Sequence, residues 1–272
     1  MIHSIGGKGR RPRWAALVLI GMIGGCAGVT STIAPDVPVY PGFDTSIYPG
    51  DGAMRTWRAE SPYRWVGYYL PAPCRRDNSW VGKRATLERM GWGIALLYVG
   101  QQQWDGTPDP DPGLSPESIL CSRTLLTAEQ GRRDARDAAD RAAAEGFPPG
   151  SHIFLDIERT ERIGPEMANY YQAWLRGIVQ DGRYRPATYA HRINAAALYM
   201  LAQGAFALDK ASLEPPFWVA GTGGFTLSSH PTRSGAPYAD LWQGALDVQR
   251  EWGGVRLLID ENTATRPNPS AP

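Results

Sequence analysis

Short apolar segments alternate with helix-forming segments along most of this sequence, and that order restricts the fold more than any other feature. Apolar runs rich in β-branched and aromatic residues indicate buried strands, which we predict at 42–46, 64–70, 93–99, 152–158, 185–191, 217–220, 241–243 and 255–260. Helix signals fall between them, at 83–90, 127–145, 165–180 and 193–203. Strands that alternate with helices are typical of a parallel α/β sheet or barrel.

Local signals mark several of these boundaries. Thr127 and Gln130 form a capping box, and Pro165 suits the first turn of a helix. After residue 220 the chain has little helix signal, and 221–237 is full of Gly, Ser, Thr and Pro. Eight strands with helices absent from the last third predict an incomplete, TIM-like (β/α) barrel.

The composition is that of an ordinary globular protein. The chain has 272 residues, of which 43% are hydrophobic and 20% charged, with a net charge of +1. This length suits one large domain, and we find no internal repeat. The balanced charge argues against nucleic acid as a partner, because nucleic-acid binders usually carry a basic face.

The first 26 residues have the layout of an export signal. A basic region with Lys8 and Arg13 precedes the apolar run 14–23, which is too short to span a bilayer permanently. Gly24, Gly25 and Cys26 resemble a bacterial lipobox, so a lipid on Cys26 would attach the protein to a membrane. Simple cleavage is the alternative, and the pair Arg10–Arg11 permits twin-arginine export. We therefore expect an exported protein of the cell envelope or periplasm.

The rest of the chain divides simply. We predict a Pro-rich tether at 27–40, a barrel domain at 41–265 and a disordered tail at 266–272. With Cys26 lipidated or removed, Cys74 and Cys121 remain as an even pair in an oxidising compartment, which favours a disulfide between two loops. A metal site is not expected, since no further pair or H-x-x-x-H spacing accompanies them, and we expect no cofactor.

Two acids end the strand at 152–158. Asp156 and Glu158 are separated by one residue, so on a strand they share a face about 6.5 Å apart. Mutual repulsion raises the pKa of at least one such carboxyl, which suits an acid and a base. The alternative is two solvated acids that pair with Arg159 and Arg162.

On an α/β barrel, chemistry takes place at the carboxyl ends of the strands. The acids expected there are Asp44, Asp156, Glu158 and Asp260. Because the first and eighth strands are neighbours in a closed barrel, Asp44 and Asp260 should meet beside the other two. Four converging carboxylates are a more specific signal than any one of them.

Several short motifs in fixed order resemble a known family. They are G-F-D-T-S at 42–46, G-Y-Y-L at 67–70, Y-V-G at 98–100, D-I-E at 156–158, F-W-V-A at 217–220, L-W-Q at 241–243 and I-D-E-N at 259–262. The chain resembles the secreted glycoside-hydrolase-like family typified by mycobacterial exported proteins, which is related to family 25 glycoside hydrolases, the lysozyme-type muramidases. Glu261 departs from the hydrolases, which more often carry an apolar or aromatic residue there.

The resemblance implies a barrel of five βα units followed by three closing strands. It implies that Glu158 is the general acid and base and that Asp156 orients the substrate N-acetyl group, in a substrate-assisted retaining route. Asp44 and Asp260 would hold the sugar and tune the protonation of this pair. The residues expected to contact the sugar are Tyr189, Trp218, Trp242 and Asn262.

Three functions fit these residues. The first is a cell-envelope glycoside hydrolase that cuts a glycan rich in N-acetyl sugars, such as peptidoglycan. The second is a non-catalytic, glycan-binding lipoprotein that keeps the same barrel. The third is a structural envelope protein whose acids only stabilise loops.

Overall fold

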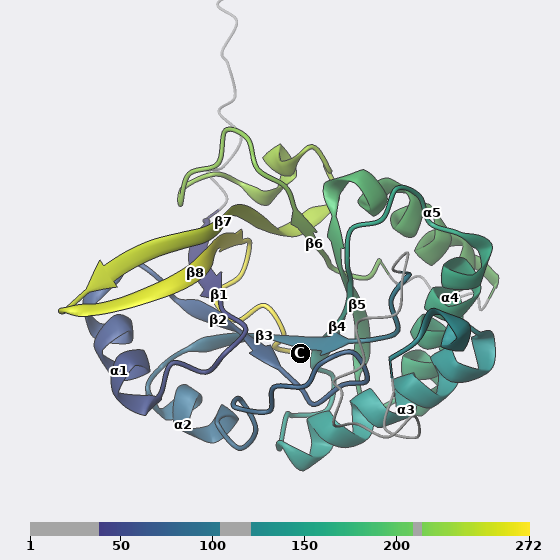
Figure 1. Ribbon diagram of the computed structural model, residues 1–272, viewed down its shortest axis with the longest axis horizontal. Coiled ribbons are helices and arrows are strands. Elements are labelled where there is room, and N and C mark those ends of the chain that lie inside the picture. The colour runs from purple at the N-terminus through teal and green to yellow at the C-terminus, as the bar shows by residue number, and fades with distance from the viewer. Residues whose placement is uncertain (1–37, 104–120, 209–213) are drawn as a thin grey trace, which may run out of the picture. The chain divides into compact units, whose positions relative to one another are not determined.

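The protein forms a closed barrel of eight strands. The computed structural model describes residues 38–103, 121–208 and 214–272. The strands are β1 (Tyr40–Asp44), β2 (Trp65–Tyr69), β3 (Gly93–Val99), β4 (His152–Ile157), β5 (Arg185–His191), β6 (Phe217–Ala220), β7 (Ala239–Trp252) and β8 (Val255–Ala264). They pair in chain order, and β8 closes the ring against β1 (Figure 1). The predicted α/β, TIM-like barrel is confirmed.

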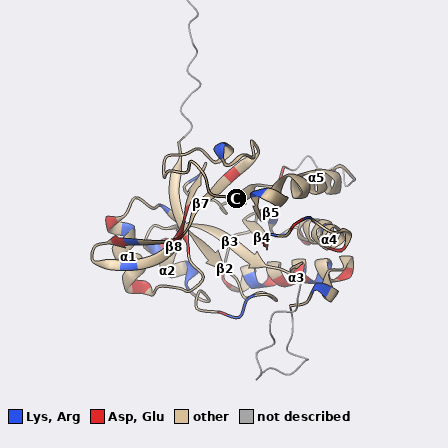
Figure 2. Cartoon of the chain, turned by 45° about the horizontal axis from the view of Figure 1, so that its top comes forward, with Lys and Arg blue, Asp and Glu red and all other residues tan. Residues whose placement is uncertain are grey.

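Helices lie between successive strands from β1 to β6. They are α1 (Asp51–Glu60), α2 (Arg84–Arg89), α3 (Ala128–Ala144), α4 (Pro165–Asp181) and α5 (Arg192–Leu208). The predicted cap of α3 is present, because the Thr127 hydroxyl accepts a hydrogen bond from the Gln130 amide at 3.1 Å. Charged residues gather on the helices and loops, whereas the strands carry few (Figure 2).

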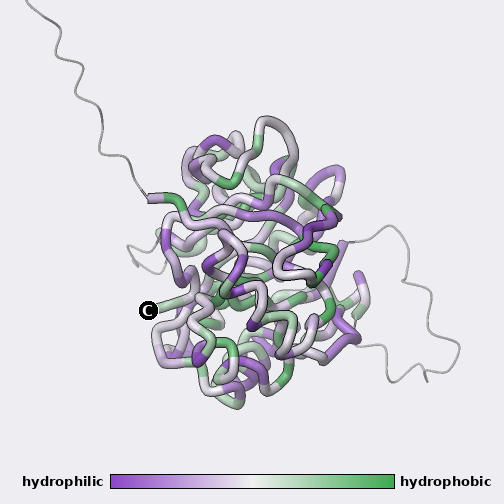
Figure 3. The backbone as a smooth tube through the Cα atoms, turned by 90° about the vertical axis from the view of Figure 1, so that its left-hand side faces the viewer, coloured by the Kyte–Doolittle hydropathy of each residue, from purple (hydrophilic) through white to green (hydrophobic). Residues whose placement is uncertain are grey.

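Two apolar cores hold these layers together. The barrel interior is filled by Trp65, Ala95, Leu97, Phe154, Ala187, Trp218, Leu241 and Ala264. A larger core packs the outer faces of the strands against the helices, including Trp57 of α1 and Trp174 of α4. Hydrophobic segments accordingly gather in the middle of the domain, and hydrophilic ones lie on its outer turns (Figure 3).

Helix α1 was not predicted. The sequence indicated no helix between the strands predicted at 42–46 and 64–70, but 51–60 is helical. Only Met54 and Trp57 of this helix are buried. Such a short helix depends on packing rather than on local signals, so its pattern is weak.

The end of the barrel also differs from the prediction. Strands β7 and β8 continue well beyond 241–243 and 255–260 and form an antiparallel hairpin. Trp252 pairs with Val255 across Gly253 and Gly254, both of which have positive φ, as a two-residue hairpin turn requires. Strand β8 therefore runs against β1, and Asp260 lies inside it rather than at its carboxyl end.

The C-terminal segment 266–272 is ordered, which corrects the expectation of a disordered tail. The Asn268 side chain accepts a hydrogen bond from the Ile94 amide at 2.9 Å, and the Ser270 hydroxyl accepts one from Leu96 at 2.8 Å. The Ser270 carbonyl accepts a third from His152. These bonds satisfy amides of β3 and β4, so the tail covers the amino ends of these strands.

We predict that removal of residues 266–272 lowers the free energy of unfolding by about 3 kcal/mol or more. The truncation leaves strand amides without partners, each at a cost of about 1–3 kcal/mol. Urea denaturation followed by tryptophan fluorescence measures the change. Removal of the exposed Pro272 alone is the control and should change stability by less than about 0.5 kcal/mol. If both truncated proteins were equally stable, the tail would not stabilise the amino ends of β3 and β4.

Candidate functional site

The four predicted acids meet at one mouth of the barrel. Asp44 ends β1 and is paired in register with Asp260 of β8. Asp156 lies near the end of β4, and Glu158 follows it. The charges of Asp44 and Glu158 both act on Asp156, so the acids of all three strands face a common space. The predicted convergence is thus present in the structure.

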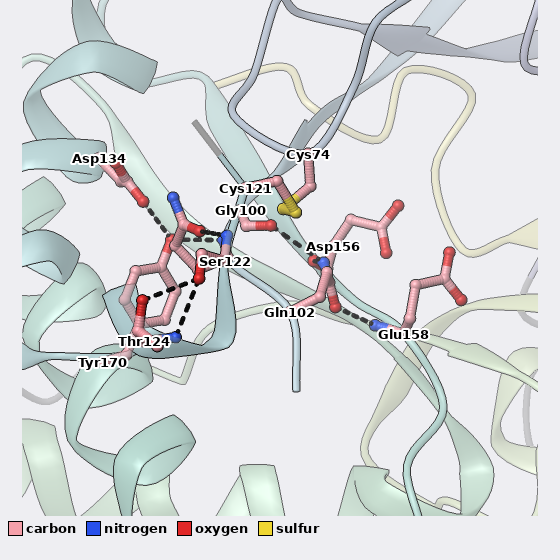
Figure 4. The surroundings of a disulfide bond; sticks show 11 residues. Cys74, Gly100, Gln102, Cys121, Ser122, Thr124, Asp134, Asp156, Glu158 and Tyr170 are labelled. Carbon is pink, nitrogen blue, oxygen red and sulfur yellow. Dashed lines mark hydrogen bonds between the residues drawn. A yellow bond between two sulfur atoms is a disulfide. The ribbon is translucent and has the colours of Figure 1, made fainter. Parts of the chain in front are cut away.

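Asp156 and Glu158 project side by side (Figure 4). Asp156 is 5% exposed, whereas the Glu158 side chain is exposed at the rim. The alternative in which these acids pair with neighbouring arginines has no support here, because no salt bridge joins either acid to Arg159 or Arg162 among the described residues.

Gln102 fixes the chain that carries this pair. Its Nε2 donates to the Asp156 carbonyl at 2.8 Å, and its Oε1 accepts from the Glu158 amide at 3.0 Å (Figure 4). The two bonds satisfy both backbone groups just where β4 ends. Gln102 therefore sets the direction in which both carboxylates point.

Asp44 is held by three neutral donors. Its Oδ1 accepts from the Tyr69 hydroxyl at 3.0 Å, and its Oδ2 accepts from Gln243 at 2.9 Å and Asn262 at 2.8 Å. Burial raises the pKa of Asp44, and these hydrogen bonds oppose the increase. Gly67 makes room for this acid, since a Cβ at that position would lie 2.6 Å from the Asp44 Cβ.

Gln243 connects three residues of the mouth. Its Nε2 donates to Asp260 at 3.1 Å as well as to Asp44, and its Oε1 accepts from the Tyr189 hydroxyl at 2.7 Å. Burial, followed by the charge of Asp44, raises the pKa of Asp260 to about 7. Asp260 therefore titrates near neutral pH beside a buried Asp44.

Asp156 is the least compensated of the four acids. Burial raises the pKa of Asp156 well above its usual range, and the charges of Glu158 and Asp44 raise it further. Its Oδ1 is buried and has no hydrogen-bond partner in the described part of the chain. An unpaired buried carboxylate oxygen is costly, so this atom is free to receive a donor from a ligand.

Glu158 is also shifted toward the protonated form. Surrounding protein removes water from its carboxyl and raises the pKa of Glu158, and the charge of Asp260 adds to the effect. The Arg159 amide opposes the increase by a backbone hydrogen bond. A carboxyl with a raised pKa holds its proton to higher pH than an ordinary glutamate, as a general acid requires.

Arg75 is a cation whose charge acts on Asp156, and it was not predicted. Its guanidinium lies 4.1 Å from the Tyr69 ring centre, forms a salt bridge with Asp77 at 3.3 Å and lowers the pKa of Asp156 against the other effects. The preceding residue, Cys74, is disulfide-bonded to Cys121, which confirms the predicted pairing (Figure 4). The disulfide thus anchors the loop that carries Arg75.

The predicted sugar-contact residues occupy different environments. Tyr189 lies at the mouth, partly exposed and bonded to Gln243. Trp218 is fully buried beneath it at 5.3 Å between ring centres, and its Nε1 donates to Asn262, which is also fully buried. Trp218 and Asn262 therefore support the site from below and present no open face to a ligand.

Trp242 lies away from the mouth. It is 2% exposed, packs edge-on against Phe225 and donates from Nε1 to the Gly221 carbonyl at 2.8 Å. Its neighbours in β7, Leu241 and Gln243, face the barrel interior, so Trp242 faces outward. The structure does not bring it together with the acids.

Glu261 has a structural explanation. Its carboxylate accepts a hydrogen bond from the Tyr63 hydroxyl and forms a salt bridge with Arg250, both at 2.7 Å. These partners lie on the outer side of the barrel, opposite Asp260 and Asn262. The departure from the hydrolase motif therefore leaves the acidic mouth unchanged.

Two absences hold for the described ranges. No group of three or more His, Cys, Asp or Glu side chains there is arranged to hold a metal ion. No helix in those ranges is both long and apolar enough to cross a membrane. The expected export signal and Cys26 lie outside the described residues.

A closed barrel with an acidic mouth at the ends of its parallel strands is the setting in which α/β-barrel enzymes carry out their chemistry. The family model described as "Rv2525c-like, glycoside hydrolase-like domain" matches residues 55–264, which is most of the chain. The chain belongs to this family. A comparison with curated proteins gives no match.

Solved structures share the fold at low sequence identity. An uncharacterised protein of B. stearothermophilus is 17% identical, with 83% of this chain and 95% of that chain covered and a TM-score of 0.54. The spore cortex lytic enzyme SleM of Clostridium perfringens is 14% identical over 85% and 68%, with a TM-score of 0.53. The catalytic domain of the endolysin ply40, from a bacteriophage of Listeria monocytogenes, is 16% identical over 84% and 93%, with a TM-score of 0.51.

We predict that Asp156→Asn raises the free energy of unfolding by about 1–3 kcal/mol at pH 7. The raised pKa means that the folded protein retains a proton that the unfolded chain releases, so stability falls as pH rises above the unfolded value of about 4. The amide removes this cost, and its benefit should vanish near pH 3. Urea denaturation at both pH values measures the difference.

Asp181→Asn is the matched control with the opposite sign. Arg183 lowers the pKa of Asp181, so this carboxylate stabilises the fold above the unfolded pKa and loses that effect in acid. The control should be about 1 kcal/mol less stable at pH 7. If Asp156→Asn were also destabilising at pH 7, Asp156 would not be an uncompensated buried charge.

Proposed function

We propose that this protein is a glycoside hydrolase that cuts an N-acetyl-sugar glycan, such as peptidoglycan, in the cell envelope. The observation that carries the proposal is the pair at the barrel mouth. Asp156 offers a buried oxygen without a partner in the described chain, and Glu158 beside it has a raised pKa. Proteins that share the fold include a spore cortex lytic enzyme and a phage endolysin.

Glu158 is assigned the role of general acid and base. Its exposed position at the rim lets it reach the glycosidic oxygen of a bound strand, and its raised pKa supplies the proton. After the leaving sugar departs, the Glu158 carboxylate removes a proton from the attacking water. The same residue thus serves both steps of a retaining reaction.

Asp156 is assigned to the N-acetyl group of the substrate. Its free oxygen accepts the acetamide N–H and turns the acetamide carbonyl oxygen toward the anomeric carbon. That oxygen forms a bond to the carbon as the glycosidic bond breaks, and water later opens the cyclic intermediate. A hydrogen bond from the acetamide N–H to Asp156 favours the charged form of this carboxylate. Substrate binding therefore leaves Asp156 ionised and Glu158 protonated.

The remaining acids act on this pair through charge. Asp44 raises the pKa of Asp156, and Asp260 raises that of Glu158. Both are fixed by Gln243, so their charges stay in place when a sugar binds. Tyr189, which donates a hydrogen bond to Gln243 at the mouth, is assigned to contact the sugar.

The envelope location rests on two observations. The first 26 residues have the layout of an export signal, and the disulfide between Cys74 and Cys121 suits an oxidising compartment. A lipid on Cys26 would hold the enzyme at the membrane that faces its glycan substrate.

We predict that Glu158→Gln lowers the rate of reducing-end release from purified peptidoglycan by at least about a thousandfold. The amide keeps the shape of the side chain but cannot donate or accept the catalytic proton. Released muropeptides are separated by chromatography and identified by mass.

Glu88→Gln is the matched control. Glu88 pairs with Arg84 on the surface of α2. The Glu88→Gln variant should therefore be as active as the native protein. Full activity of Glu158→Gln would reject the assigned acid. If the native protein sediments with the glycan but releases no muropeptides, the protein is a binding module instead.

A further inference from the structure

A bulge interrupts the hairpin of β7 and β8 at the barrel mouth. The register of the two strands shifts there, which leaves Leu246 and Asp247 of β7 opposite the single residue Asp260 of β8. Two residues that face one across a strand pair are the defining feature of a β-bulge. Bulges are frequent next to active sites, where they redirect a side chain or a backbone group.

Asp247 holds an unusual backbone conformation within this bulge. Its φ is 52°, and among the residues that the structure describes no other residue except glycine has a positive φ. The left-handed region costs an L-residue free energy, although Asp and Asn tolerate it better than most side chains. Such a conformation persists only where its surroundings hold it, and it often has a use at a functional site.

The bulge directs the Asp247 amide to a carboxylate of the mouth. This amide donates a hydrogen bond to Asp260 Oδ1 at 2.7 Å, while Gln243 Nε2 donates to Asp260 Oδ2 at 3.1 Å. Both oxygens of Asp260 therefore receive a donor from β7. In a regular antiparallel ladder, an amide pairs with a backbone carbonyl or points away from the partner strand. The bulge thus turns a backbone donor toward a side chain.

Asp247 acts on Asp260 in two opposite ways. Its amide lowers the pKa of Asp260, whereas its exposed carboxylate raises that pKa by charge. Asp44, from β1, raises the pKa of Asp260 as well. Asp260 in turn raises the pKa of Glu158, after β4, and that of the Tyr189 hydroxyl on β5. The groups that act with Asp260 from these elements are all acids, so the amide of Asp247 opposes their combined effect.

We propose that Asp247 is a positioning residue of the barrel mouth, whose left-handed backbone aims the amide that fixes the Asp260 carboxylate. Because Asp260 acts on Glu158 through charge, the effect of the bulge reaches the proposed general acid. The part of the inference that concerns catalysis rests on the proposed function. The hydrogen bond itself is tested without substrate.

The first test is an NMR titration of the native protein. The carboxyl carbon of Asp260 should titrate at about pH 7, and the amide proton of Asp247 should follow it with the same midpoint. A charged acceptor makes the stronger hydrogen bond, so the amide signal should move downfield as Asp260 ionises. An Asp247 amide that does not follow Asp260 would overturn the proposal.

Two variants separate the amide of Asp247 from its charge. Deletion of the exposed Leu246 restores one-to-one pairing and takes the amide away from Asp260, so the midpoint of Asp260 should move to higher pH. Asp247→Asn tolerates the left-handed backbone and keeps the amide but removes the charge, so the midpoint should move to lower pH. A merely structural role would not produce shifts of opposite sign. Equal midpoints in the native protein and the deletion variant would reject the proposal.

A second substitution and a control complete this series. If the deletion variant does not fold, Asp247→Val replaces it, because a β-branched residue disfavours positive φ. The midpoint of Asp260 should then lie at higher pH in Asp247→Val than in Asp247→Asn, although both variants lose the same charge. Glu251→Gln removes a charge farther along β7, where Glu251 pairs with Arg256, and should leave the midpoint unchanged.

The activity test measures the pH dependence of kcat/KM on purified peptidoglycan. The general acid must be protonated, so the alkaline limb of this profile reports the pKa of Glu158. Deletion of Leu246 leaves Asp260 less ionised and less firmly held, which should move that limb to lower pH and lower kcat/KM at pH 7 by about tenfold. Asp247→Asn should keep at least about half of the native activity.

The two proposals can fail independently. If the Asp260 midpoints shift as expected but the native protein hydrolyses no glycan, Asp247 remains a positioning residue and the hydrolase is rejected. If the native protein hydrolyses the glycan but the deletion variant shows the same Asp260 midpoint and the same pH profile, the hydrolase remains and the positioning role is rejected.

Discussion

The structure depends on keeping several carboxyl groups close together where little water reaches them. Asp44 and Asp156 are buried at the barrel mouth, and within the described ranges only the Asp44 carboxylate accepts hydrogen bonds that offset the loss of hydration. Neutral hydrogen-bond donors such as Gln243 stabilise the charge of Asp44. A cation in their place would lower the pKa values of the acids toward the usual range. The consequence is a set of acids whose pKa values are all raised, at a cost in stability that a purely structural site would have no reason to retain.

The way the barrel closes creates this arrangement. Strand β8 runs antiparallel between β7 and β1, which places Asp260 opposite Asp44 and Asn262 within reach of it. Trp218 fills the barrel below and holds Asn262 in turn. The apolar interior thus positions the polar mouth, and one hydrogen-bonded chain links the buried indole to the acids.

Sequence patterns predicted the four acids but not the side chains that hold them in place. Asp156 and Glu158 could be predicted because a buried strand that ends in two same-side carboxyls is unusual. Gln102 could not, since a neutral amide in a loop carries no pattern, and Gln243 stood in the L-W-Q motif without an assigned role. Alternation along 241–243 did contain the information that Trp242 and Gln243 face opposite sides, and the double glycine at 253–254 signalled the hairpin that reverses β8. The ordered tail was unpredictable because its bonds join distant backbone amides.

Titration of the side-chain carboxyl carbons by NMR tests the central claim most directly. With ¹³C-labelled Asp and Glu, the signals of Asp156 and Glu158 should titrate above their usual range, and each should shift when the other is changed to its amide. Asp260 should titrate at about 7. Independent titration of all these groups near pH 4 would contradict the account, because the barrel mouth would then be an ordinary solvated surface.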